Sequence, residues 1–272
     1  MRLPMRIAIA ALTTFVLSGA TASPSLALST NNPQWQRCEK GAAGAKFKDS
    51  ACLESLESGE FAVLTLESGS REIKAKAVGS QELEVVKVGI VCKKLSLGSG
   101  SKVTGAGSEA ISGGEATIKD EECEVTGQPS CEINKAKAGA ASVSSKKLKV
   151  AEIYKSKEAA EKETPETITV LEPESVEGKK IFATIELSGT CTGTGTFNLE
   201  GELAFENVSS STHQLELEIE APTSAIGKGF FNSGKKTTER VIAPLKGNGQ
   251  SARYHGGGAV FLGSAELWWL FH

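Results

Sequence analysis

Hydrophobic and polar residues alternate with a period of two along much of the chain. Successive side chains of a β-strand point to opposite faces, so this alternation predicts strands with one buried and one solvated face. Clusters of Gly, Ser, Asn and Pro separate these segments, as turns between strands require. The predicted strands are Phe61–Leu66, Glu82–Val88 followed by Gly89–Cys92, Ile181–Leu187, Phe197–Phe205, Leu215–Ile219, Ala259–Leu262 and Glu266–Phe271.

Many short strands between turns predict an all-β fold, namely an antiparallel sandwich or an irregular barrel of roughly ten to fourteen strands. Strands do not alternate with long helical segments, so a parallel α/β sheet is not expected. Ser156–Thr164 breaks the pattern, because it is rich in helix-forming residues and ends before Pro165. It predicts either one helix of about two turns at most, or a charged hairpin tip between Leu148–Tyr154 and Glu166–Leu171.

The first 22 residues have the pattern of a secretory signal peptide. Arg2 and Arg6 precede an apolar run, Ile7–Leu17, and Ala20-Thr21-Ala22 offers a small-x-small cleavage site. The alternative is an uncleaved membrane anchor. We therefore predict a secreted or cell-surface protein with a flexible segment at residues 23–34. A single disulfide-stapled β domain follows at residues 35–272, and the polar stretch 135–180 is the best place for a seam within it.

All six cysteines follow this predicted signal peptide. They are Cys38, Cys52, Cys92, Cys123, Cys131 and Cys191. An even number of cysteines in an exported chain predicts disulfides, although six cysteines allow fifteen pairings. Proximity along the chain favours Cys38 with Cys52 and Cys123 with Cys131, which leaves Cys92 with Cys191. A metal site is not predicted, because there is no Cys-x-x-Cys pair and no histidine lies near a cysteine.

Charge and composition exclude several classes of protein. The 272 residues include 30 Lys and Arg against 33 Asp and Glu, so the formal net charge is −3. A nucleic-acid partner is not expected without a basic excess. Only Asp49 and Asp120 are aspartate, too few for the acidic loops that bind calcium, and only three residues are histidine, which leaves little for a zinc enzyme.

Two glycine-rich motifs carry no predicted chemistry. His255-Gly256-Gly257-Gly258 resembles the oxyanion loop of lipases, but the chain has no Gly-x-Ser-x-Gly nucleophile elbow to accompany it. Gly193-Thr194-Gly195 lacks the third glycine and the following helix of a nucleotide loop. We therefore predict no nucleotide partner, no cofactor and no catalytic residues.

Glu216-Leu217-Glu218-Ile219-Glu220 is the sharpest enzymatic pattern. On a strand, alternate residues share one face at a spacing of about 7 Å. The three carboxylates resemble the Glu-x-Asp-x-Glu strand of a jelly-roll glycoside-hydrolase group, with Glu216 and Glu220 as nucleophile and acid/base. Glu218 replaces the central aspartate of that group. The simpler interpretation is that glutamates cover the solvent face of strands here, as we also expect for Glu82, Glu84, Glu200 and Glu202.

The C-terminal segment Leu267-Trp268-Trp269-Leu270-Phe271 suggests a third alternative. Aromatic strand ends are typical of envelope β-barrels, but such barrels carry aromatic girdles on many strands. Only three residues of this chain are tryptophan and two are tyrosine. A closing strand packed into the core is therefore favoured.

Short motifs around the cysteines resemble a set of exported, functionally uncharacterised proteins of soil actinobacteria. The motifs are Trp35-Gln36-Arg37-Cys38, Asp49-Ser50-Ala51-Cys52, Gly59-Glu60-Phe61, Ile90-Val91-Cys92, Glu121-Glu122-Cys123 with Cys131, and Thr190-Cys191. The resemblance implies a secreted, β-rich, cysteine-paired protein and brings no known activity.

The sequence therefore predicts an exported, non-catalytic, β-rich module of the cell surface or extracellular space, either structural or binding an unknown ligand. Contact with the cell wall or a polysaccharide is one partner that fits this location. The alternatives are the carbohydrate-active hydrolase on Glu216 and Glu220, and the envelope barrel.

Overall fold

The computed structural model describes residues 32–50, 52, 54–66, 69–86, 88–105, 111–164, 166–208, 217–221, 225–233, 236–262 and 268–271. Within 217–219 and 268–271 only the backbone is described. The predicted signal peptide and most of the segment 23–34 lie outside these residues. Asn32, near the end of that segment, is buried and hydrogen-bonds to the backbone of Asn232.

The fold is all-β, as the alternation predicts, and every paired strand is antiparallel. The described residues contain 21 strands, more than the roughly ten to fourteen expected, together with one helix. Several strands are also longer than expected, and β3 alone has 16 residues. No helix in the described part of the chain has the length and apolar character needed to cross a membrane.

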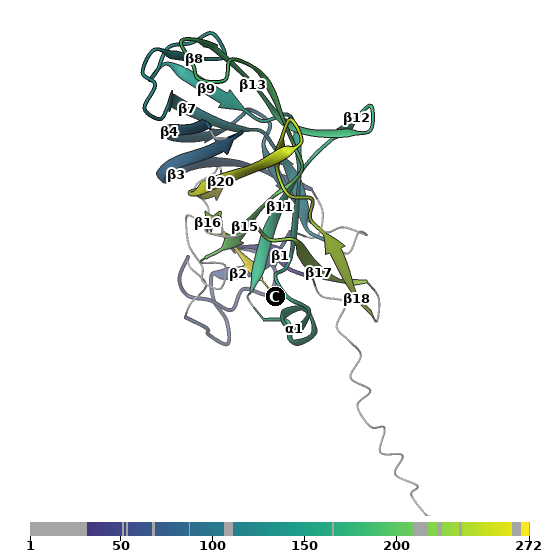
Figure 1. Cartoon of the computed structure of the whole chain (residues 1–272). Coiled ribbons are helices and arrows are strands. Elements are labelled where there is room, and N and C mark those ends of the chain that lie inside the picture. Colours follow the sequence, from purple (N-terminus) through teal and green to yellow (C-terminus); the bar gives the residue numbers. More distant parts are fainter. Residues whose placement is uncertain are drawn as a thin grey trace, which may run out of the picture.

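Two closed rings of strands share the two long strands β3 (Ser70–Val85) and β20 (Gln250–Leu262). We call them the upper and lower barrels, after their places in Figure 1. Between β3 and β20, the lower barrel runs through β5 (Lys102–Thr104), β6 (Gly113–Ala116), β10 (Leu148–Tyr154), β11 (Thr167–Pro173), β15 (Leu203–Asn207) and β16 (Leu217–Glu220).

The upper barrel closes through a different set of neighbours. It runs from β3 through β4 (Val88–Leu97), β7 (Ile118–Val125), β9 (Ala141–Ser144), β13 (Lys179–Gly189), β14 (Gly195–Glu200) and β19 (Lys246–Gly247) to β20. The link between β9 and β13 is a single bridge from Ser145 to Ala183. The predicted seam region 135–180 supplies strands to both barrels, β9 to the upper one and β10 and β11 to the lower one.

Two glycines bend the shared strands where the barrels meet. Gly79 of β3 has a φ of +79° and Gly256 of β20 has a φ of +133°, and the register of the two strands shifts between His255 and Gly257. A Cβ on Gly256 would lie 2.4 Å from the side-chain oxygen of Gln81 and 3.1 Å from its Cα. Glycine is required here because the left-handed backbone and the close approach both exclude a side chain.

Three smaller groups of elements surround the barrels. The first is the N-terminal sheet of β1 (Gln34–Lys40), β2 (Phe61–Thr65) and β21 (Trp268–Phe271). The second is the hairpin of β17 (Lys228–Ser233) and β18 (Lys236–Val241). The third consists of β8 (Cys131–Ile133) and β12 (Ser175–Val176), which each pair with β13. Trp35 of β1 packs against Ile73, Val103 and Val260 of the lower barrel. The N-terminal sheet therefore closes part of that barrel.

The one helix, α1 (Lys157–Lys162), lies at the tip between β10 and β11. Both alternatives for Ser156–Thr164 are thus combined, since a short helix forms the hairpin tip. The side chain of Ser156 accepts a hydrogen bond from the backbone N–H of Ala159, and Glu163 ends the helix with a φ of +51°. The N-cap bond satisfies one of the free N–H groups of the first turn.

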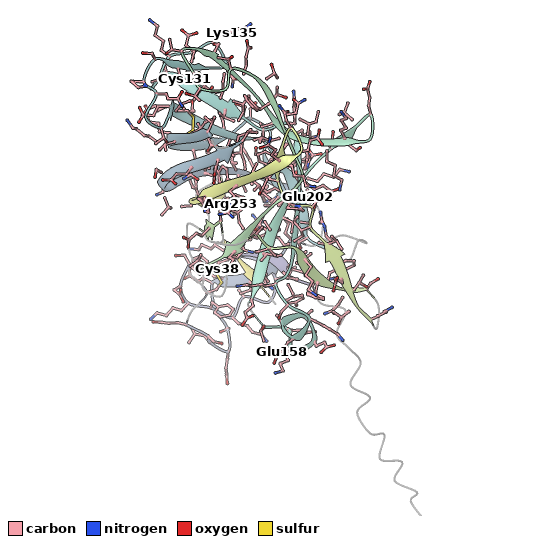
Figure 2. The ribbon with its side chains drawn as sticks, in the orientation of Figure 1. Cys38, Cys131, Lys135, Glu158, Glu202 and Arg253 are labelled. Atoms are coloured by element: carbon pink, nitrogen blue, oxygen red, sulfur yellow. A yellow bond between two sulfur atoms is a disulfide. The ribbon has the colours of Figure 1, made fainter. Side chains whose placement is uncertain are left out.

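Three disulfides join the six cysteines, and only one of the predicted pairs is correct. Cys38 is bonded to Cys52 as expected, but Cys92 is bonded to Cys123 and Cys131 to Cys191. The predicted Cys123–Cys131 and Cys92–Cys191 pairs are wrong because strand register, rather than distance along the chain, decides the pairing. Cys92 and Cys123 lie opposite each other on β4 and β7, with Cα atoms 4.0 Å apart. Figure 2 shows Cys131 in the upper part of the molecule and Cys38 in the lower part.

Two predicted strands are interrupted by turns. Glu82–Val88 was expected to be continuous, but the chain turns at Val86, whose φ is +49°, between β3 and β4. Phe197–Phe205 was also expected to be one strand, but Gly201 turns the chain between β14 and β15 with a φ of +119°. A β-branched residue is rare in the left-handed region, so the sequence gives no turn signal at Val86.

Candidate functional site

A cavity of about 60 Å³ lies inside the lower barrel. Seven of the eight strands of that barrel line it, together with Leu95 and Leu97 of β4, Ile118 of β7 and Trp35 of β1. The lining side chains are almost all apolar, and the carboxyl and hydroxyl groups among them belong to Glu152 and Thr169. A barrel of eight strands has an interior just wide enough for side chains or for one small ligand.

Alternation along β10 carries Glu152 into this interior. Leu148, Val150, Glu152 and Tyr154 are in phase and are all buried, whereas Lys149 between them is exposed. Only 1% of Glu152 is accessible to solvent. A buried carboxyl needs hydrogen-bond partners, because an unpaired charge in an apolar interior costs several kcal/mol or more.

Thr169 and Asn207 supply these partners on the neighbouring strands β11 and β15. The Thr169 hydroxyl lies 3.0 Å from both carboxyl oxygens of Glu152 and 2.8 Å from the side-chain oxygen of Asn207. The Asn207 amide donates to Oε2 of Glu152 at 3.1 Å and to the hydroxyl of Thr167 at 3.0 Å. The four side chains form one continuous network.

The protons of this network are consistent with a neutral Glu152. A hydroxyl carries one proton, so Thr169 cannot donate both to an ionised Glu152 and to Asn207. If Glu152 is protonated, it donates to Thr169, Thr169 donates to Asn207, and the Asn207 amide donates back to Glu152. Burial raises the pKa of Glu152 to about 8, although the hydrogen bonds from Asn207 and Thr169 act to lower it. The site therefore presents an uncharged acid to the cavity near neutral pH.

Glycines keep space open on the opposite wall. Gly257 and Gly258 of β20 line the cavity. A Cβ on Gly258 would lie 3.2 Å from the Cδ2 atom of Leu95, so a larger residue would press against that side chain. The His255–Gly258 motif thus lies within a strand and contributes room to the cavity.

A second buried acid lies beside this wall. The Tyr254 hydroxyl is 3.0 Å from the side-chain oxygen of Gln81 and 3.2 Å from Oδ1 of Asp120. The Gln81 amide donates to the backbone oxygen of Gly257 at 2.9 Å. Burial raises the pKa of Asp120 to about 7, although the hydrogen bond from Tyr254 acts to lower it. This network fixes the backbone of the cavity-lining Gly257.

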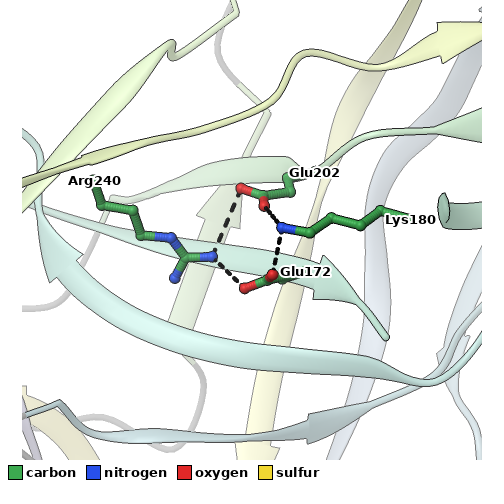
Figure 3. A network of polar contacts seen from close by, with 4 residues as sticks. All are labelled: Glu172, Lys180, Glu202 and Arg240. Carbon is green, nitrogen blue, oxygen red and sulfur yellow. Dashed lines mark hydrogen bonds and ion pairs between the residues drawn. The ribbon is translucent and has the colours of Figure 1, made fainter. Parts of the chain in front are cut away.

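Four charged residues form a closed ring of ion pairs (Figure 3). Lys180 contacts Glu172 at 2.5 Å and Glu202 at 2.8 Å, and Arg240 contacts the same two carboxylates at 2.8 Å and 3.6 Å. Burial alone would raise the pKa of Glu172, but the hydrogen bond from Lys180 and the charge of Arg240 lower it below its usual range. Two carboxylates and two cations balance, so the ring has no net formal charge.

Glu202 does not face solvent, contrary to the expectation from the sequence. It is 5% accessible, because it lies in the turn after Gly201 and not on a continuous strand. Glu82, Glu84 and Glu200 are respectively exposed, exposed and half-buried. The solvent-facing pattern therefore holds at Glu82 and Glu84 and in part at Glu200, and it fails for Glu202 at the turn and for Glu152 on β10.

Of the predicted hydrolase residues, Glu220 is the one whose side chain is described, and it does not line the cavity of the lower barrel. Glu216 lies outside the described residues, and so does the side chain of Glu218. Glu220 is exposed at the end of β16, in register with Glu206 and Gly257. Among the described residues, no group of three His, Cys, Asp or Glu side chains could hold a metal ion.

The sequence contained a usable signal for both buried acids. Glu152 falls in phase with Leu148 and Val150, the apolar positions of its strand, and Asp120 falls in phase with Ile118. Asp120 is also one of only two aspartates in a chain that otherwise uses glutamate. An acidic residue on the apolar phase of a strand predicts a buried, hydrogen-bonded carboxyl.

Comparison with known proteins identified no similar protein. The chain matches no protein-family model, no curated protein and no solved structure.

Proposed function

We propose that the protein is an exported, non-catalytic binding module whose lower barrel takes up a small, largely apolar molecule with one hydrogen-bonding group. The observation that carries this proposal is the position of a single buried carboxyl, Glu152, in an otherwise apolar cavity inside a closed barrel. Ligand sites commonly combine apolar walls with a few placed polar groups. Export is supported by the signal-like N-terminus and by three disulfides, which persist in oxidising compartments.

The size of the cavity restricts the ligand. An apolar protein cavity of about 150 Å³ holds benzene, and this one is about 60 Å³. An alkyl chain is favoured over a ring system because it is narrower. A five-carbon chain is no smaller in volume than benzene, so it enters only if the cavity-lining leucines move aside. Leu95 and Leu97 are only partly buried and pack at the edges of their clusters, so they have room to adjust.

The chemistry of Glu152 restricts the polar end of the ligand. The one proton of neutral Glu152 is donated to Thr169, but its oxygens can accept a further hydrogen bond, so the site suits a ligand hydroxyl that donates. An anionic ligand is disfavoured, because the cavity wall contains no cationic side chain among the described residues. A short straight-chain alcohol is the simplest molecule that combines both features.

Titration of the ¹⁵N-labelled protein with 1-pentanol, followed by NMR, tests the proposal. We expect saturable shifts at the amides of Glu152, Thr169 and Val260, and none at Ile133 or Ile185 in the upper barrel. The matched control is 1,5-pentanediol, which places a second hydroxyl in the apolar part of the cavity and should bind at least tenfold more weakly. Equal affinities, or shifts spread over both barrels, would show that the cavity is not the binding site.

A further inference from the structure

A second, larger cavity lies where the two barrels meet. This junction groove has a volume of about 290 Å³. It is lined by the start of β15 and the turn before it, by Ala221 after β16, by the segments before β17 and β19, and by residues 251–255 of β20. Its lining includes Glu202, Leu203, Ala221, Pro244, Arg253 and His255. Figure 2 shows Glu202 and Arg253 at the same level, between the upper and lower barrels.

Backbone hydrogen bonds fix the walls of the junction groove. Glu202 N–H donates to Ala243 at 2.8 Å, Ala252 N–H donates to Leu245 at 3.0 Å, and Ala221 N–H donates to Gly256 at 2.8 Å. A Cβ on Gly201 would lie 2.5 Å from the backbone oxygen of Pro244, so glycine allows these segments to meet. The groove is therefore held open by the fold itself rather than by flexible side chains.

One wall offers an unused hydrogen-bond acceptor. Oε1 of Glu202 accepts a hydrogen bond from Lys180, but Oε2 has no hydrogen-bond donor among the described residues and lies 3.6 Å from Arg240. Only 5% of Glu202 is accessible. Buried carboxylate oxygens normally accept a hydrogen bond. Oε2 is itself buried, so a ligand hydroxyl would complete this site once a small rotation of the Glu202 side chain turns Oε2 toward the groove.

The other wall offers an unpaired cation. Ser251, Arg253 and His255 alternate with the buried Ala252 and Tyr254, so they share the outer face of β20. Arg253 is exposed and forms no ion pair with any described residue, although Glu84 lies opposite it on β3. A guanidinium group binds a carboxylate through two parallel hydrogen bonds.

We infer that the junction groove binds an acidic sugar, with the carboxylate on Arg253 and a ring hydroxyl donating to Glu202. The apolar faces of Leu203, Ala221 and Pro244 provide contact area for the carbon face of a sugar ring. The volume lies close to the lower limit of about 300 Å³ for ligand pockets, which suits one monosaccharide unit. Arg253 is the one Lys or Arg side chain among the described residues that line the groove, and it forms no ion pair there.

Binding of D-glucuronate, measured by ligand-observed NMR and by amide shifts of the ¹⁵N-labelled full chain, tests this inference. We expect shifts at Ala252, Arg253 and His255. D-Glucose lacks the carboxylate and cyclohexanecarboxylate lacks the hydroxyls, so each should bind at least tenfold more weakly. Equal binding of glucose and glucuronate would overturn the assigned role of Arg253, and equal binding of cyclohexanecarboxylate would overturn that of Glu202.

Two variants distinguish binding at the junction groove from non-specific attraction of an anion to positive charge. Arg253→Gln should weaken glucuronate binding at least tenfold. Lys135→Gln removes one positive charge from the far tip of the upper barrel, where Lys135 is 77% exposed (Figure 2), and should leave binding unchanged. Both side chains are exposed, so both variants should fold. An equal loss in the two variants would overturn the inference.

An oligouronate distinguishes the source of the sugar. Tighter binding of a tetragalacturonate than of galacturonate would indicate an acidic polysaccharide, and equal binding would indicate a free monosaccharide. Failure of this inference is separable from failure of the lower-barrel proposal, because 1-pentanol and glucuronate should shift different sets of amides.

Discussion

The upper and lower barrels are built alike and filled differently. Both are closed antiparallel rings that share β3 and β20. The large buried side chains of Ile185 and Leu199, with Ile133 of the adjoining β8, fill the upper barrel. The Cys92–Cys123 disulfide joins two of its strands, and Cys131–Cys191 joins β8 to the segment after β13. None of the strands of the lower barrel contains a cysteine, and its interior holds a cavity lined by the buried carboxyl of Glu152.

This difference fits the proposal that the upper barrel provides stability and the lower barrel binds a ligand. Side chains that fill an interior stabilise it through close packing, and disulfides restrict the unfolded chain. An open cavity does the opposite, since it lowers stability in the absence of a ligand. Ligand sites are commonly drawn from the less stable parts of a protein. The upper barrel can therefore support a lower barrel that is less well packed.

Loss of the Cys131–Cys191 disulfide should reduce the stability of the protein more than any of the other changes below. The bridge spans a sequence separation of 60 residues, so replacing both cysteines by alanine should lower the free energy of unfolding by about 4 kcal/mol. Urea denaturation measures the loss. The folded double variant should still bind 1-pentanol with unchanged affinity, because the bridge lies in the upper barrel. Loss of binding in the folded variant would show that the two barrels are not independent.

Glu152→Gln should make the lower barrel less sensitive to pH. The folded-state pKa of Glu152 is about 8, above its ordinary value of 4.5. Between these values the unfolded chain has released a proton that the folded chain keeps, so the contribution of Glu152 to stability is present below pH 4.5 and is lost as the pH rises to about 8. Glutamine can replace the neutral acid, since it donates to Thr169 and accepts from Asn207.

We therefore expect similar stabilities for the wild type and Glu152→Gln at pH 4.5, and a variant that is more stable by about 4 kcal/mol at pH 8.5. Urea denaturation at several pH values measures the difference between the two proteins, which cancels contributions from other groups such as Asp120. Parallel curves for the two proteins would show that Glu152 does not change its protonation in this range.

The sequence could predict the all-β class, because period-two alternation depends only on local side-chain direction. It also located α1 and the Cys38–Cys52 bridge, whose two cysteines are close in the chain. It could not predict the bridge from Cys92 to Cys123, because this pair depends on the register of β4 against β7. The turn at Val86 was missed because a β-branched residue gives no turn signal. The candidate site was missed for a similar reason, since its partners Glu152, Thr169 and Asn207 come from three strands that only the folded barrel brings together.

The same substitution placed in each barrel gives the smallest effect and the most direct comparison of packing. Ala183 of β13 is fully buried in the upper barrel, whereas Ala75 of β3 lines the lower cavity. Ala183→Val should lower the free energy of unfolding by about 1–3 kcal/mol, because extra methyl groups strain a packed core. Ala75→Val should change it by less than about 0.5 kcal/mol, because the cavity has room for the added volume.

Urea denaturation of both variants measures the change in the free energy of unfolding, and titration with 1-pentanol measures the change in affinity. Ala75→Val should also weaken 1-pentanol binding at least tenfold, because the new methyl groups occupy the space that we assign to the ligand. Ala183→Val should leave that affinity unchanged. Equal destabilisation by the two substitutions would mean that both interiors are packed to the same density. The lower barrel would then have no spare volume for a ligand, and the distinction between a supporting and a binding barrel would fail.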